Sequence, residues 1–304
     1  MVNILGTRIV RTVLPLAAAG LLVIYGVISF MIARGVTQAD RYSQEAQPSD
    51  YGLEYEDVEF PSRQGGLILS GWYLSEDSGS PHIIFIHGIG SVRSGDQAVE
   101  LASRLMDFDF NVLMFDLRGH GSSSGDRVSG GYFERWDVLG AFDYLLEQGV
   151  DPGRIGLMGF SMGAAASILA AAEESRINAV AVDSTFANAS DLIAREAARK
   201  TAIPGWLTPI FMPASKLMAN GIYGIDIGAL VPERAVSKLD YPVLVIHGIA
   251  DERVPWQQGQ RVAAASKEGS SIWLVPRVKH VDAFLEHPEE YVRKVSGYFD
   301  RQLR

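Results

Sequence analysis

Short apolar runs alternate with longer helical patterns along most of the chain, and this alternation constrains the fold more than any other feature. Mostly apolar runs of this length are typical of parallel strands covered on both faces. Alternating strands and helices predict a doubly wound, mostly parallel α/β sheet, whose functional site lies at the carboxyl ends of the strands. The expected strands are His82–Ile86, Asn111–Phe115, Arg154–Met158, Ala179–Val182, Pro242–Ile246 and Ser271–Val275. The expected helices are Gln97–Asp107, Phe133–Gln148, Met162–Glu174, Gln257–Ser266 and Glu289–Gln302.

Two segments depart from this alternation. Val58–Phe60 and Leu67–Leu69 flank Gln64-Gly65-Gly66 and predict an opening hairpin. Thr185–Glu233 has several prolines and large apolar residues but no clear strand. A long insertion inside a compact domain is usually functional, so we expect a short cap at about 185–233, partly helical around 188–200. The whole α/β domain is expected over residues 52–304.

The N-terminal region contains a long uncharged stretch. Val13–Ala33 is 21 residues rich in Leu, Ile, Val and Ala, with Arg8 and Arg11 before it and Arg34 after it. As a helix it would be about 31 Å long, close to the hydrocarbon thickness of a bilayer. This length predicts a transmembrane helix.

We therefore expect a short N-terminal segment at 1–12, a single-pass anchor at 13–33 and a polar linker at 34–51. A cleaved signal peptide is one alternative, although its apolar region is normally shorter; a buried core helix is another. The arginines on the two sides nearly balance, so the positive-inside rule orients the helix weakly. We favour a short N-terminus inside and an extracytoplasmic catalytic domain.

Composition excludes several classes of protein. The formal net charge of −9 argues against nucleic-acid binding, which usually requires a basic patch. The chain has no cysteine, so disulfides, thiolate catalysis and cysteine-based metal sites are excluded. No cofactor and no metal are implied by the motifs.

The pentapeptide Gly159-Phe160-Ser161-Met162-Gly163 lies between an expected strand and an Ala-rich expected helix. This G-x-S-x-G pattern in a strand–turn–helix context is typical of a nucleophile elbow. The turn is so sharp that only glycine fits two residues to either side of the serine. It predicts Ser161 as the nucleophile and the N–H of Met162 as an oxyanion donor. The alternative is a chance match, which the position after a strand makes less credible.

A serine hydroxyl needs a base that takes its proton. His280 follows the last expected strand in the loop Pro276–His280, at the carboxyl edge of the sheet, and is the predicted base. The remaining histidines occupy positions that favour structural roles or carry no catalytic signal: His82, His87, His120, His247 and His287.

The base in turn needs an orienting carboxylate. Asp251 comes shortly after the strand that ends at Ile246, and the order Ser161, Asp251, His280 matches the Ser…Asp…His order of this kind of enzyme. Asp183, after the preceding strand, is the rival acid, with a capping or buried hydrogen-bonding role as its alternative. Asp282 is too close to His280 in the chain for the same geometry.

Two glycine-containing loops follow the first two expected parallel strands. His87-Gly88-Ile89-Gly90 lets the backbone approach a substrate oxygen, so we expect the N–H of Ile89 to be the second oxyanion donor. Asp116–Gly125 is also glycine-rich, but it lacks the lysine of a P-loop. We expect this second loop to be mainly structural.

Together, the segments HGIG, DLRGHGSSSG, GFSMG, HGIADERVP and VKH closely resemble the α/β-hydrolase superfamily. Within it, the chain resembles the membrane-anchored branch that includes Bem46-type and serine-aminopeptidase-like hydrolases. The resemblance covers about Tyr51–Arg304. It implies the α/β-hydrolase fold, a catalytic triad of Ser161, Asp251 and His280, and no cofactor. The loop HGIGS departs from the HGGPG-like loop of the peptidase members, which weakens an aminopeptidase assignment.

The expected activity is hydrolysis of a carboxylic ester, thioester or lipid-like acyl ester through an acyl-enzyme. The expected partners are a small-molecule or lipid-like ester substrate and the membrane. A peptidase or amidase would use the same three residues, and a non-catalytic ligand-binding protein of this fold is a further alternative. A haloalkane dehalogenase is excluded, because it needs a carboxylate where this chain has Ser161.

Overall fold

The computed structural model describes residues 4–200 and 203–304. The chain divides into two compact units. One contains Met1–Thr37 and Ile193–Ile227, and the other contains Gln38–Leu192 and Gly228–Arg304. We call the first the anchor unit and the second the sheet unit, and describe each by itself.

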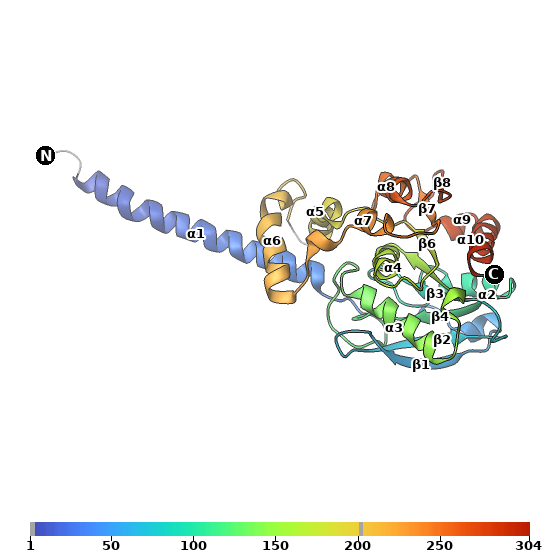
Figure 1. Cartoon of the computed structure of the whole chain (residues 1–304). Helices are drawn as coiled ribbons and strands as arrows, with labels where there is room; N and C mark the ends of the chain where they lie inside the picture. Colours follow the sequence, from blue (N-terminus) through green and yellow to red (C-terminus); the bar gives the residue numbers. More distant parts are fainter. Residues whose placement is uncertain (1–3, 201–202) are drawn as a thin grey trace. The chain divides into compact units, whose positions relative to one another are not determined.

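The sheet unit is built on an eight-stranded sheet in the order β1-β2-β4-β3-β5-β6-β7-β8 (Figure 1). β1 and β2 form an antiparallel hairpin, β2 is antiparallel to β4, and the remaining neighbours are parallel. The predicted hairpin and doubly wound sheet are therefore confirmed. The strands are β1 (Glu56–Pro61), β2 (Ile68–Leu74), β3 (His82–Ile86), β4 (Asn111–Phe115), β5 (Ile155–Phe160), β6 (Ala179–Asp183), β7 (Leu244–Gly248) and β8 (Ser271–Val275).

Helices cover both faces of this sheet, which explains why the central strands are apolar throughout. Successive side chains of a strand point to opposite faces. On β5, Leu157 packs into the core beneath α3, α4, α7 and α8, whereas Met158 packs into the core beneath α2 and α10. The helices of the sheet unit are α2 (Ala98–Met106), α3 (Glu134–Glu147), α4 (Met162–Glu173), α7 (Pro232–Val236), α8 (Gln257–Ala265), α9 (Ala283–Glu286) and α10 (Pro288–Leu303). Short 3-10 turns lie at η1 (Pro48–Tyr51), η2 (Pro152–Arg154) and η3 (Ile227–Ala229).

The anchor unit combines two segments that are far apart in the chain. Helix α1 (Ile4–Thr37) extends beyond the predicted 13–33 at both ends, and it packs against α6 (Thr208–Tyr223). Its segment Val13–Thr37 is long and apolar enough to cross a membrane, with a mean hydropathy of 2.3 and only 17% of its most apolar window buried. The low burial argues against a core helix.

The predicted cap at about 185–233 contains α5 (Ala189–Lys200), α6 and η3, and it ends at the start of α7. The expected helix at 188–200 corresponds to α5.

The later part of the predicted linker is hydrogen-bonded to the sheet unit. Helix α1 continues to Thr37, so only the later part of 34–51 connects the two units. The Arg41 guanidinium donates hydrogen bonds to the carbonyls of Gly121, Ser123 and Gly125, at 2.7, 2.8 and 2.6 Å. These bonds hold the segment after α1 on the glycine-rich loop that follows β4.

Candidate active site

Ser161 lies in a strained turn between β5 and α4. Its φ is +52°, a conformation that a residue with a side chain rarely adopts. The glycines on either side are required by close packing. A Cβ on Gly163 would lie 2.1 Å from the carbonyl oxygen of Ile86, and one on Gly159 would lie 2.6 Å from the carbonyl oxygen of Gly163. The steric reason for the G-x-S-x-G pattern is therefore present in the structure.

Three side chains from separate loops meet at this turn. Ser161 Oγ is 2.8 Å from His280 Nε2, and His280 Nδ1 is 2.6 Å from Asp251 Oδ2. Because a carboxylate only accepts hydrogen bonds, the Nδ1 atom of His280 carries the proton. Its Nε2 atom is then free to accept the proton of the serine hydroxyl. Three of the residues predicted for the site are thus joined by hydrogen bonds.

The carboxylate of Asp251 is held in its ionised form. Its Oδ1 accepts hydrogen bonds from the backbone N–H groups of Arg253 and Val254, at 2.9 and 2.8 Å. Burial by itself raises the pKa of Asp251, but hydrogen bonds with His247 and His280 outweigh it and hold the pKa well below its ordinary value. His247, expected to be structural, lies 3.3 Å from Asp251 Oδ2 and donates to the Val254 carbonyl at 2.9 Å.

The loop that carries His280 is strained on both sides of the histidine. Arg277 and Val281 have φ values of +64° and +62°. The loop also packs tightly on the end of β7, where a Cβ on Gly248 would lie 2.3 Å from the carbonyl oxygen of Val278. Backbone strain of this kind persists where the surrounding structure determines the conformation. The contact with β7 keeps the loops of Asp251 and His280 together.

The rival acid, Asp183, has other partners. Its Oδ1 accepts a hydrogen bond from Ser184 Oγ at 2.9 Å, and its Oδ2 accepts one from Tyr291 Oη at 3.0 Å. Complete burial raises the pKa of Asp183 to about 6, although those two hydrogen bonds oppose the shift. Ser184 Oγ in turn accepts a hydrogen bond from the N–H of Val281 at 3.1 Å. Asp183 therefore supports the histidine loop rather than the imidazole itself.

Sequence reasoning did not find Ser184 or Tyr291. Ser184 directly follows the end of β6, where a polar residue could have been noticed. Tyr291 lies within α10, and no motif distinguishes it from an ordinary core residue. Only the packing of α10 beside β6 reveals their role.

Two backbone N–H groups beside Ser161 have no acceptor within the part of the chain that the structure describes. Gly88 packs directly on the serine, since a Cβ there would lie 3.1 Å from the Ser161 Cβ. The next N–H, that of Ile89, and the N–H of Met162 at the start of α4 donate to no acceptor among residues 4–200 and 203–304. Unpaired N–H groups at a helix N-terminus and a neighbouring loop are well suited to receive a developing negative charge.

His87 fixes the loop that carries Ile89. Its Nε2 accepts a hydrogen bond from the N–H of Leu117 at 3.0 Å, and its Nδ1 donates to the carbonyl of Gly88 at 2.8 Å. Burial lowers the pKa of His87 to about 3, so the ring is neutral and can accept at Nε2. The ring packs edge to face on His120, at 4.9 Å between centroids. These contacts of His87 lie within the loops that follow β3 and β4.

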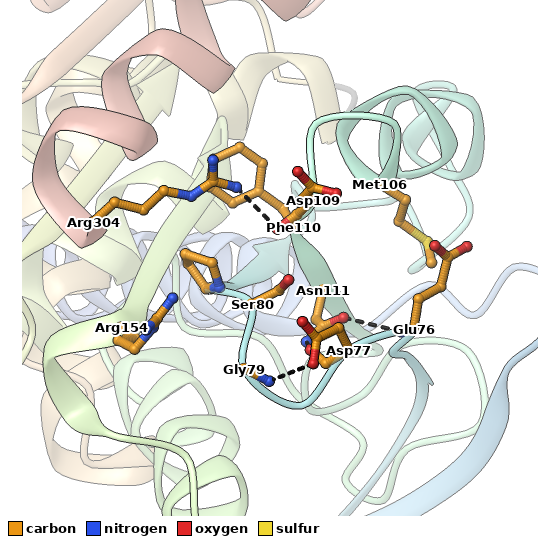
Figure 2. A pocket seen from close by; sticks show the side chains of 11 residues that line it. Glu76, Asp77, Gly79, Ser80, Met106, Asp109, Phe110, Asn111, Arg154 and Arg304 are labelled. Atoms are coloured by element: carbon orange, nitrogen blue, oxygen red, sulfur yellow. Dashed lines mark hydrogen bonds between the residues drawn. The ribbon is translucent and has the colours of Figure 1, made fainter.

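A separate cavity of about 380 Å³ lies at the other edge of the sheet (Figure 2). Its lining includes Pro81, Asn111 and Arg154, which stand at the amino ends of β3, β4 and β5, whereas Ser161 follows the carboxyl end of β5. The cavity is therefore not part of the serine site. In the described part of the chain, no cluster of three or more His, Asp or Glu side chains could hold a metal ion.

Comparison with known proteins finds a family model, solved structures and relatives that are similar to this chain. A family model described as alpha/beta hydrolase fold matches residues 81–210. An esterase of Pyrococcus furiosus, Pf2001, has a TM-score of 0.72 at 26% identity, covering 88% of this chain and 99% of the esterase. The uncharacterised protein YfhR of Escherichia coli O157:H7 is 28% identical over 250 residues, 80% of each chain.

A further relative is the lysophosphatidylserine lipase ABHD12 of Danio rerio, 27% identical over 216 residues, which are 67% of this chain and 54% of the relative. The esterase and the lipase support hydrolase activity. Together with the sheet order and the match to the family model, these similarities lead to one conclusion: the chain has the α/β-hydrolase fold.

Proposed function

We propose that this protein is a membrane-anchored serine hydrolase that cleaves carboxylic esters through an acyl-enzyme. The observation that carries the proposal is the continuous hydrogen-bonded chain from Ser161 Oγ through His280 to Asp251, with spacings of 2.8 and 2.6 Å. This is the arrangement that a nucleophile, a general base and an orienting acid require. The strained turn under Ser161 and the low pKa of Asp251 support the same roles.

In the proposed reaction, Ser161 Oγ attacks the ester carbonyl carbon while His280 Nε2 takes the hydroxyl proton. The tetrahedral oxyanion accepts hydrogen bonds from the N–H groups of Ile89 and Met162, which would each stabilise it by about 3 kcal/mol. His280 then gives its proton to the leaving alcohol. Water then attacks the acyl carbon and loses a proton to His280. His280 returns this proton to Ser161 Oγ as the bond between the acyl carbon and Oγ breaks and the acid leaves. Asp251 stays ionised throughout and stabilises the imidazolium.

An ester with an apolar acyl chain is the proposed substrate class. Two kinds of relative support it, an esterase from the solved structures and a lipase acting on lysophosphatidylserine. An amide substrate would use the same groups, and the loop HGIGS lacks the HGGPG-like extension expected of a peptidase. An ester is therefore the first choice, with thioesters in the same class.

Helix α1 is the proposed membrane anchor. A cleaved signal peptide would remove a helix whose second half is packed within the anchor unit. Ile32 of α1 is buried together with Phe211 and Met212 of α6. Loss of α1 would uncover this apolar cluster, which favours a retained helix. We further propose that the short N-terminus is cytoplasmic and the sheet unit extracytoplasmic; reporter fusions at each terminus test this orientation.

The catalytic assignment is tested with the full chain in detergent. Wild type, Ser161→Ala and the control Ser78→Ala, an exposed serine at the other edge of the sheet, are compared for labelling by a fluorophosphonate probe and for hydrolysis of nitrophenyl esters. We expect Ser161→Ala to abolish labelling and to lower kcat by about 10⁴-fold or more, and Ser78→Ala to change neither. Labelling that persists in Ser161→Ala would refute the nucleophile.

Aminoacyl nitroanilides, assayed on the same samples, separate an esterase from an amidase. Faster turnover of the amide than of the matched ester would overturn the substrate class. A folded wild type that turns over neither compound would favour the non-catalytic alternative.

A further inference from the structure

The exposed face of α6 has the wrong polarity for a helix that faces water. Trp206, just before the helix, and Ile210 and Leu217 within it are 78%, 57% and 74% exposed. With the exposed Pro213 they follow a spacing of four, three and four residues, which places them on one face. We call these four residues the α6 stripe. A surface helix of a globular domain normally carries polar and charged residues there.

The opposite face of α6 is already used. Phe211 and Met212 are buried with Ile32 of α1. The Phe211 ring stacks on Tyr25 with 5.4 Å between centroids, and Tyr25 Oη donates to the carbonyl of Ile210 at 3.1 Å. Thus α6 is held on α1 by one face while the α6 stripe points away from that contact. The α6 stripe is therefore not the face by which α6 packs against α1.

The position of the contact along α1 sets the depth of α6. Tyr25 and Ser29, whose side chains both reach α6, are eight and four residues before Ala33, the last residue of the uncharged stretch. At about 1.5 Å per residue, these positions lie roughly 12 and 6 Å inside the end of that stretch. Interfacial helices bury their apolar faces about 5–10 Å into the boundary between head groups and acyl chains.

The direction of α6 agrees with that depth. Figure 1 shows α6 crossing α1 rather than running alongside it. If α1 spans a bilayer, a helix that crosses it lies near the plane of the membrane. Of the sixteen residues of α6, only Lys216 is charged. A tryptophan at one end is typical of the membrane interface.

We propose that α6 is an interfacial membrane helix, embedded beside α1 with the α6 stripe in contact with lipid. The occupant of this apolar face is the bilayer itself, because the stripe belongs to the same compact unit as α1, whose exposed apolar side chains include Leu21, Val23 and Val27. The placement rests on the proposed anchor role of α1. It extends that role, since the segment predicted as a cap becomes part of the membrane-bound unit.

The absence of native cysteine allows a direct test with single-cysteine variants. Leu217→Cys in the α6 stripe is compared with Leu21→Cys on α1 and with Glu268→Cys, an exposed position on the sheet unit. Each full chain carries a nitrobenzoxadiazole probe and is reconstituted into phosphatidylcholine vesicles at a low protein-to-lipid ratio. Nitroxide lipids with shallow or deep spin labels then quench the probes that contact lipid.

We expect the probe at 217 to show blue-shifted emission and at least twofold quenching by the shallow nitroxide, with weaker quenching by the deep one. The probe at 21 should be quenched and the probe at 268 should not. A probe at 217 that behaves like the one at 268 would overturn the proposal. Blue-shifted emission without lipid quenching would also overturn it, because another protein surface would then cover the stripe. An unquenched probe at 21 would refute the anchor role itself, which is a distinguishable outcome.

Discussion

Replacing each of two buried aspartates by asparagine distinguishes the orienting acid from the residue that supports its partner loop. Asp251 hydrogen-bonds to His280, whereas Asp183 hydrogen-bonds to Ser184 and Tyr291. Both substitutions keep the shape of the side chain and remove its charge. We expect Asp251→Asn to lower kcat by about 10⁴-fold, the loss that the same change causes in chymotrypsin-like triads. We expect Asp183→Asn to keep kcat within about tenfold of wild type.

The two variants should also differ in how stability depends on pH. Burial raises the pKa of Asp183 from 3.8 to about 6. Well below pH 3.8 the residue is protonated in both the folded and the unfolded chain, so its ionisation does not affect the free energy of unfolding there. Above pH 6 it is ionised in both states, and ionisation is unfavourable in the folded one. At about 1.36 kcal/mol per pKa unit, the stability contributed by Asp183 falls by roughly 3 kcal/mol as pH rises through this range.

The assay is thermal unfolding of the detergent-solubilised full chain, followed by intrinsic fluorescence between pH 4 and 7.5. Since asparagine does not titrate, the Tm of Asp183→Asn minus that of wild type should increase with pH. For a unit of this size, 3 kcal/mol corresponds to about 6–12 °C. A Tm difference that stays constant across the range would refute the burial argument. Equal loss of kcat in both variants would refute the assignment of Asp251 over Asp183.

Three further predictions concern local packing. Gly163→Ala should prevent accumulation of folded protein in an expression and solubility assay, because its Cβ would lie 2.1 Å from the Ile86 carbonyl oxygen; a soluble variant with normal kcat would contradict this. Ser184→Ala should lower kcat about tenfold with KM little changed, since the N–H of Val281 loses its acceptor and the His280 loop loosens; unchanged kcat would show that the strained loop holds itself. Deleting residues 1–37 should cause aggregation, measured by size-exclusion chromatography, because it uncovers the apolar cluster on α6; a monodisperse product without detergent would argue against that packing.

Most of the fold could be read from local patterns. Strands covered on both faces are mostly apolar, so their runs identify β3 to β7 directly, and the edge strand β8 has a similar run. The turn at Ser161 admits only glycine at 159 and 163, and this steric demand leaves a visible motif. Because loops after parallel strands gather at one edge, the sequence also placed His280 and Asp251 near the serine.

The tertiary structure showed how each of the two candidate carboxylates is used. The sequence favoured Asp251 over Asp183, but both lie at or shortly after the end of a strand, so the contacts of each side chain could not be read from the sequence. The contact of the β7 end with the histidine loop brings Asp251 to the imidazole, while Ser184 and Tyr291 engage Asp183. Likewise, nothing local pairs α6 with α1, whose linking hydrogen bond joins residues 185 positions apart. Steric and burial constraints that act over a few residues produce recognisable sequence motifs. Contacts between residues that are distant in the chain depend instead on how the completed helices and strands pack.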